Sequence, residues 1–174
     1  MLHHTKCALD AGATVEELAE ILLPCVVSRG IPAWLEGMKA LAFAETFTGR
    51  TKEDKKEAPS VRFGNIEECR QYLVNENSRV PDWAAKMELF NEDALLAYTQ
   101  MRVNILRDGV VSRKLKEFVL VGINLADSYI HGLKVHLAAA RKDGATDQEI
   151  SEVLLTALLT AGGPAWIEGS QFLK

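Results

Sequence analysis

The feature that most constrains the fold is an internal match, because residues 4–41 align without a gap with residues 136–173. The offset is 136 − 4 = 132 positions, and about 16 of some 38 aligned residues are identical. The identical pairs include His4 and His136, Gly30 and Gly162, Trp34 and Trp166, and Glu36 and Glu168. A match at fixed spacing is typical of a duplicated structural unit. We therefore expect two copies of one unit.

Each copy is predicted to form three helices. Gly12 and Gly144 suit the left-handed position that ends a helix. Thr14 and Thr146 are each followed by a glutamate three residues later, which is a capping box at the start of a second helix. Apolar residues then recur at i, i+3 and i+4, as on the buried face of a helix. Pro32 or Pro164 is well placed to begin the third helix.

The two copies are unequal in length. Residues 82–108 and 113–126 are predicted as two further helices before the second copy, the latter capped by Ser112, whereas the sequence begins at the histidine helix of the first copy. The prediction is one complete unit and one N-terminal half-unit. Its domains are a partial repeat at 1–50, a linker with a short helix at 51–80, and a complete repeat at 81–174. Within the linker, residues 48–59 are charged and are expected to be exposed, and residues 65–74 to form the helix.

Composition limits the classes of function. The chain is 48% hydrophobic and 25% charged, with a formal charge of −4, as in an ordinary globular domain. Because no basic cluster is present, neither a nucleic acid nor an anionic membrane is expected as a partner. The longest apolar runs are too short to span a bilayer. Three widely spaced cysteines and the lack of a signal peptide predict a cytoplasmic, reduced protein.

Motifs in the second copy resemble a known family. The string K-L-K-E ends at Glu117, H-x7-G-A-T runs from His136 to Thr146, and G-G-P-A-W follows. Together they resemble the carboxymuconolactone decarboxylase family, which includes the AhpD-like alkylhydroperoxidases. The resemblance implies an all-α, AhpD-like helical bundle and a homo-oligomer, either a trimer or a hexamer. The apolar face of the half-unit also favours an oligomer, because another unit or another chain is needed to cover it.

The peroxidase branch of that family has the motif E-x11-C-x-x-C-x3-H, often with a second histidine before the later cysteine. Carried over, Glu117, His131 and His136 hold the glutamate and histidine positions. The cysteine positions hold Tyr129 and Gly132. Peroxide reduction by a dithiol needs one thiolate to attack and a second thiol to resolve the sulfenic acid. The sequence therefore excludes that cycle within the second unit.

The strongest candidate site combines Glu117, His131 and His136 as a proton relay, since a carboxylate can orient a histidine that titrates near neutrality. The decarboxylase branch keeps a histidine at the position of His136 without a cysteine pair. The alternative is a structural Glu–His pair that bridges two helices. Tyr129 could add a phenolic donor to the site, or could be an ordinary core aromatic residue.

Other candidates are weaker. Cys7 follows His4 by three residues on one helix face, so a one-cysteine peroxidase is conceivable. Ala139 occupies the matching position, which favours simple packing. Cys25 and Cys69 are expected to pack as well. The four histidines form no ligand-rich cluster, so neither a metal nor a cofactor is predicted. Glu36 and Glu168 are expected to be exposed or to cap helices.

Three classes of function remain open. The favoured one is a decarboxylase-like lyase that acts by acid–base chemistry on a small carboxylated lactone or a similar metabolite. The second is an AhpD-like peroxidase that uses Cys7. The third is a non-catalytic, oligomeric relative that binds a small molecule.

Overall fold

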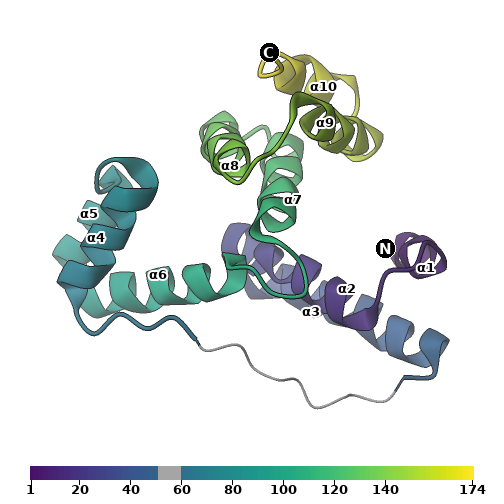
Figure 1. Ribbon diagram of the computed structural model, residues 1–174, viewed down its shortest axis with the longest axis horizontal. Helices are drawn as coiled ribbons and strands as arrows, with labels where there is room; N and C mark the ends of the chain where they lie inside the picture. Colours follow the sequence, from purple (N-terminus) through teal and green to yellow (C-terminus); the bar gives the residue numbers. More distant parts are fainter. Residues whose placement is uncertain (51–59) are drawn as a thin grey trace. The chain divides into compact units, whose positions relative to one another are not determined.

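The computed structural model describes residues 1–50 and 60–174, and those residues form helices and no strand (Figure 1). The predicted all-α class is confirmed. The helices are α1 (Leu2–Asp10), α2 (Val15–Leu22), α3 (Pro24–Thr48), α4 (Ile66–Asn77), α5 (Asp82–Phe90), α6 (Glu92–Leu106), α7 (Arg113–Ala126), α8 (Ile130–Lys142), α9 (Asp147–Ala161) and α10 (Gly163–Ser170). Most of the predicted exposed linker, residues 51–59, lies outside the described residues.

The chain forms two compact units. The first comprises Met1–Asp54 and Asp108–Lys174, and the second comprises Lys55–Arg107. This division follows contacts in space and does not test the predicted repeat boundaries at residues 50 and 80, which stay a prediction.

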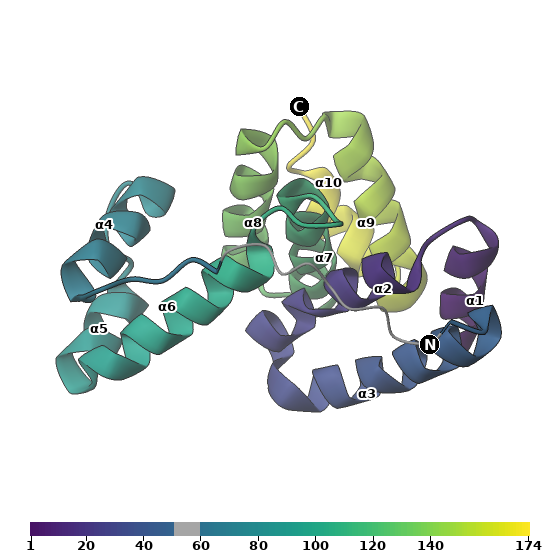
Figure 2. The same cartoon turned by 60° about the horizontal axis from the view of Figure 1, so that its bottom comes forward.

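In the first unit, α7 is the helix on which the others pack. It contacts α8, α9 and α10 on one side, and α2 and α3 elsewhere along its surface (Figure 2). Phe118, Val121 and Leu125 of α7 belong to one buried cluster with apolar residues of α8, α9 and α10. Ser112 begins α7 as predicted, because its hydroxyl oxygen accepts a hydrogen bond from the Leu115 amide.

The two segments that match in sequence also match in backbone features. Gly12 and Gly144 both have positive φ, of 100° and 86°. Thr14 and Thr146 both form the predicted capping boxes. Gly30 (φ 72°, ψ −171°) and Gly162 (φ 80°, ψ −176°) share a conformation that is essentially confined to glycine. The local signals of the sequence therefore have the same structural result in both segments.

The matched segments differ at the second helix. α9 runs without interruption, whereas in the first segment the helix breaks between α2 and α3 at Pro24, which has no amide hydrogen to continue it. Thr156 occupies the matching position in α9. α3 is kinked at Gly30, so that Pro32 lies in the first turn beyond the kink, in line with the prediction.

The second unit consists of α4, α5 and α6 around a small core of Ile66, Cys69, Leu73, Ala84 and Leu95. α4 confirms the predicted short helix. The single helix predicted over residues 82–108 is wrong, because the chain is extended at Asn91 (φ −161°, ψ 97°). The Asn91 side chain accepts a hydrogen bond from the Ala94 amide and so begins α6 as a separate helix.

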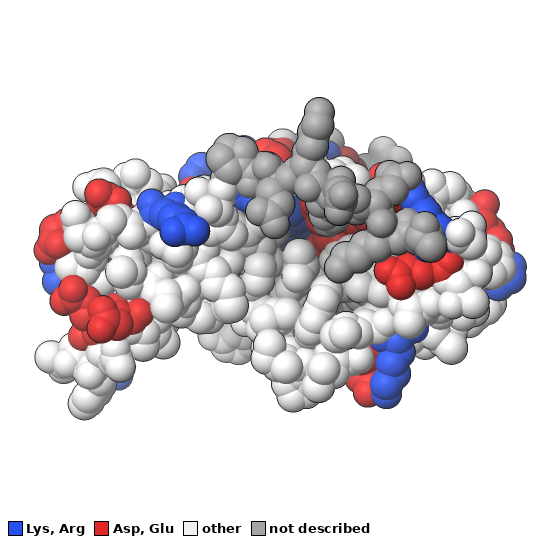
Figure 3. Space-filling model, turned by 90° about the horizontal axis from the view of Figure 1, so that it is seen from below, with Lys and Arg blue, Asp and Glu red and all other residues white. Residues whose placement is uncertain are grey.

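No single described helix is long and apolar enough to cross a membrane; α2 and α3 meet the criteria only as a pair, across a bend of 94°. On the face drawn in Figure 3, lysines, arginines and acidic residues lie singly or in small groups among uncharged residues.

Candidate functional site

The candidate site is a buried carboxylate–imidazole pair that joins α7 to α8. Nδ1 of His136 lies 2.7 Å from Oε2 of Glu117. The two residues are only 7% and 1% exposed. Buried polar groups are normally hydrogen-bonded, and this pair satisfies one ring nitrogen and one carboxylate oxygen at once. The structure therefore brings together the two residues that the motif placed 19 positions apart.

A cation lies on the other side of the Glu117 carboxylate. Nε of Arg113, one turn earlier on α7, is 3.6 Å from Oε1 of Glu117 and 3.2 Å from Oδ2 of Asp143. The result is a polar row that runs from His136 through Glu117 and Arg113 to Asp143. A buried carboxylate is tolerated when it is paired and hydrogen-bonded in this way.

Buried apolar residues flank the pair along both helices. Phe118 follows Glu117 on α7, and Leu133, Leu137 and Ala140 accompany His136 on α8, all of them buried in the same cluster. Such surroundings lower the local dielectric constant and strengthen the interaction between Glu117 and His136.

The geometry leaves one ring nitrogen of His136 available. Among the described residues, the hydrogen bonds of His136 engage Nδ1 alone. A carboxylate that accepts from Nδ1–H fixes the tautomer and the orientation of the ring, so that Nε2 is the nitrogen left for proton transfer. This is the arrangement of a general acid–base residue.

Tyr129 and His131 are exposed, unlike the buried pair. Tyr129 is 55% exposed at the start of α8, where its amide donates to the carbonyl of Asn124. His131 is also exposed, and its ring centroid is 6.0 Å from that of Tyr129. Five residues separate His131 from His136, which places them about 140° apart around a helix. The alternative in which Tyr129 is a core residue is wrong, because more than half of the residue is exposed.

The cysteines have distinct surroundings. Cys7 is exposed, and its Sγ lies 3.7 Å from Nε2 of His3. The histidine predicted beside it was His4. Burial raises the pKa of the Cys25 thiol. Cys69 is fully buried in the second unit, which confirms its predicted role in packing. Over residues 1–50 and 60–174, no group of three or more His, Cys, Asp or Glu side chains could hold a metal ion.

A second, largely buried ion pair, which was not predicted from the sequence, joins α7 to α2. Nζ of Lys116 lies 3.1 Å from Oε2 of Glu20, with the two side chains 3% and 15% exposed. The same glutamate oxygen accepts a hydrogen bond of 3.0 Å from the Val111 amide. Lys116 itself could have indicated a buried charge, because it lies one turn before Leu120 on the same face of α7, and Leu120 is fully buried.

The pKa of Glu20 is lower than usual. Its partial burial opposes ionisation, but the amides of Val111 and Val110 and the Lys116 ammonium together outweigh burial and lower the pKa. Glu20 is therefore a charged link between α2, α7 and the turn before α7.

These features define an all-α protein with a buried carboxylate–imidazole site in the helical unit around α7. Residues 92–174 match the model of the carboxymuconolactone decarboxylase family. The resemblance predicted from the motifs is confirmed.

A solved structure supports the fold. It is the crystal structure of a putative carboxymuconolactone decarboxylase from Burkholderia xenovorans LB400, with a TM-score of 0.56 and 20% sequence identity. The likeness covers 62% of this chain and 87% of that one. At this identity it shows a shared fold alone. A search of the curated proteins found none that matches the sequence.

Proposed function

We propose that the Glu117–His136 pair catalyses acid–base chemistry on a small carboxylated metabolite, and that the reaction is a decarboxylation. The observation that carries the proposal is the 2.7 Å contact between the buried Glu117 carboxylate and Nδ1 of His136. The family supports it, since its name describes removal of a carboxyl group from a lactone. The proposal places the protein in the cytoplasm, where small metabolites and reduced thiols are found.

In this reaction, the bond between the substrate carboxyl group and its carbon breaks, and carbon dioxide leaves. The electron pair stays on the carbon, which is stabilised when it is conjugated with the lactone carbonyl. Nε2–H of His136 then gives its proton to that carbon, and one proton from solvent restores the imidazolium. Glu117 is a positioning residue that holds the ring through Nδ1 and stabilises its charged form.

The direct test measures carbon dioxide release from carboxymuconolactone and related lactone carboxylates. For a substrate that is turned over, His136→Gln is expected to lower kcat by about 10² to 10⁴-fold, the usual contribution of a general acid or base. His3→Gln, which changes an exposed histidine of α1, is the control and is expected to leave kcat unchanged. Full activity of His136→Gln would remove the basis of the proposal.

Glu117 needs a readout that a purely structural role would not change. Glu117→Gln is expected to lower kcat more than it raises KM, because the ring loses charge stabilisation in the transition state. Nitrogen NMR of the wild-type protein should show that the neutral His136 ring carries its hydrogen on Nδ1. An unchanged ring tautomer and an unchanged kcat in Glu117→Gln would limit Glu117 to packing. Variants of the exposed Tyr129 and His131 are expected to change kcat by less than about tenfold.

Peroxide reduction at Cys7 is the second candidate, supported by the 3.7 Å contact between Cys7 Sγ and Nε2 of His3. In that reaction the thiolate attacks a peroxide oxygen, an alcohol leaves, and a low-molecular-weight thiol must reduce the sulfenic acid. Peroxide consumption that is the same in Cys7→Ser as in the wild type would dismiss this candidate. Ligand-induced stabilisation without turnover would instead indicate a binding protein.

A further inference from the structure

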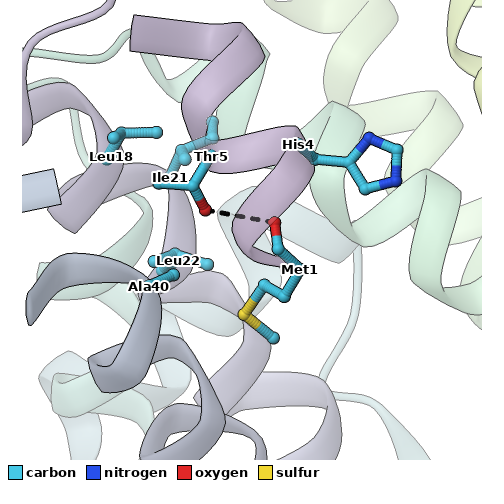
Figure 4. Close-up of a pocket in the computed structure, with 7 residues that line it drawn as sticks. All are labelled: Met1, His4, Thr5, Leu18, Ile21, Leu22 and Ala40. Atoms are coloured by element: carbon cyan, nitrogen blue, oxygen red, sulfur yellow. Dashed lines mark hydrogen bonds between the residues drawn. The ribbon is translucent and has the colours of Figure 1, made fainter. Parts of the chain in front are cut away.

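An apolar hollow lies between α1, α2 and α3 in the first unit. Its volume is about 220 Å³. Leu18, Ile21 and Leu22 of α2 and Ala40 of α3 form its walls, and Thr5 and His4 of α1 lie at its edge (Figure 4). In this view the His4 ring is directed away from Leu18 and Ile21.

The matching positions of the second segment are not hollow. Adding 132 to the six wall and edge positions gives His136, Leu137, Ile150, Val153, Leu154 and Phe172. His136, Leu137, Ile150 and Leu154 are 7%, 4%, 0% and 0% exposed, and Val153 and Phe172 are partly buried against the same cluster. They are covered there because Phe118, Val121 and Leu125 of α7 pack into the same cluster. In the first segment, by contrast, no residue of α2 is buried.

The two sets of walls share their backbone. Gly12, Thr14 and Gly30 have the same conformations or caps as Gly144, Thr146 and Gly162. The hollow therefore corresponds to the place that α7 occupies in the second segment. The chain's own α7 is already packed against α8, α9 and α10.

We propose that the hollow is a docking site for an amphipathic helix of a partner protein. The side chains of that helix would resemble those that α7 directs toward α8 and α9. Such a helix carries apolar side chains at the positions of Phe118, Val121 and Leu125, and a carboxylate directly before the first of them. That carboxylate would pair with His4 at the edge of the hollow, as Glu117 pairs with His136. Apolar anchors spaced by three and four residues are the usual means by which a helix binds a groove.

The chemistry of the hollow favours a helix. Its walls are almost entirely aliphatic, so burial of apolar side chains supplies the driving force. His4 is exposed in the described structure, so an acidic partner residue can reach it. A carboxylate next to apolar anchors would satisfy both features at once.

The test uses the full chain and a fluorescent peptide with the sequence of residues 112–127. Fluorescence anisotropy should detect binding with a Kd in the micromolar range. Ile21→Asp, which puts a charge in the wall, should weaken binding at least about tenfold, as expected for a buried, unpaired charge. Leu159→Asp is the control, because Leu159 is 85% exposed on α9; it should leave the Kd unchanged.

The carboxylate is tested by a double-mutant cycle. Replacing the glutamate of the peptide at position 117 by glutamine should weaken binding several-fold to the wild-type chain. The same replacement should have no further effect on binding to His4→Gln, because the two groups act as a pair. Equal effects in both proteins would refute the predicted contact with His4.

A second arm removes the dependence on peptide folding. Residues 112–132 are placed directly before Met1, which reproduces the connection between α7 and α8. The extended chain should have a Tm at least several degrees above that of a matched extension with aspartates at positions 121 and 125. Equal Tm values, or peptide binding that Ile21→Asp leaves intact, would overturn the proposal. If the chain forms a dimer that the Ile21→Asp substitution dissociates but added peptide does not, the hollow would instead be assigned to a second copy of the chain.

Discussion

The segments α1–α3 and α8–α10 match in sequence and in the residues that cap or end their helices, yet their apolar residues differ in burial. Leu154 of α9 is fully buried, whereas Leu22, at the matching position of α2, is only partly buried. The difference comes from α7, which covers one set of positions and leaves the other open. The shared caps and glycines thus begin and end helices at matching positions, but a core exists only where a further helix completes it.

The largest expected difference between the segments concerns these two leucines. Leu154→Ala should lower the free energy of unfolding by about 3 kcal/mol, because it leaves a cavity in a closed core. Leu22→Ala should cost about 1 kcal/mol, because its side chain is only partly removed from water. Urea denaturation followed by circular dichroism measures both. Equal losses would show that the hollow in the first segment is filled in solution.

The second comparison uses Glu20 and its match Glu152, which is exposed on α9. Glu20→Gln should cost about 1–2 kcal/mol at pH 7, because it weakens the contact with the buried Lys116 and with the Val111 amide. Glu152→Gln should be close to neutral. Similar losses for the two variants would contradict a specific role for the Glu20 ion pair.

The same pair of variants gives a pH dependence. Since the pKa of Glu20 is below its ordinary value of 4.5 in the folded chain, its contribution to stability is present above that pH. It is lost as the pH falls through the lowered, folded-state pKa. The stability of Glu20→Gln should therefore decline less between pH 5 and 3 than that of the wild type, as measured by urea denaturation. Parallel declines would remove Glu20 as a source of acid sensitivity.

Two matched glycines should respond with opposite signs. A Cβ at Gly169 would meet Cδ2 of Leu154 at 2.7 Å and Cδ2 of Leu125 at 3.0 Å. Gly169→Ala should therefore destabilise the chain by about 1 kcal/mol or more through overpacking. A Cβ at Gly37 would lie at least 3.6 Å from Leu22, and alanine favours the helix, so Gly37→Ala should stabilise by up to about 1 kcal/mol. Thermal melts distinguish the signs, and a shared sign would contradict the comparison.

The smallest difference is expected at the helix caps. Thr14→Ala and Thr146→Ala should each cost about 1 kcal/mol, because both threonines accept a hydrogen bond from an amide three residues later. These bonds are local and do not depend on α7. Denaturation of the two variants should give equal losses within experimental error. A much larger loss at Thr146 would show that burial, and not capping, sets the contribution.

Much of the fold could be predicted because it depends on local chemistry. The positive φ of Gly12 and Gly144 and the caps at Ser112 and Thr146 follow from residue type and spacing. The break at Asn91 was missed because apolar residues continue on both sides of it. The sequence Asn91-Glu92-Asp93 contains the N-cap and the acidic first turn that mark a helix start.

The site was only partly predictable. The pairing of Glu117 with His136 followed from a family motif, and the structure places the two in contact. The contacts of Arg113 with Asp143 and of Lys116 with Glu20 arise only when distant segments pack, so spacing along the chain does not reveal them. Exposure of Tyr129 and His131 likewise depends on which helices cover the start of α8.

Lys116 and Glu117 are consecutive residues of α7, and consecutive side chains on a helix point about 100° apart. One bonds to Glu20 on α2 and the other to His136 on α8, so α7 is held by polar contacts in two directions. Rolling of α7 about its own axis would have to break at least one of these bonds. The contact with Glu20 on one side of α7 thereby helps to hold Glu117 against His136 on the other.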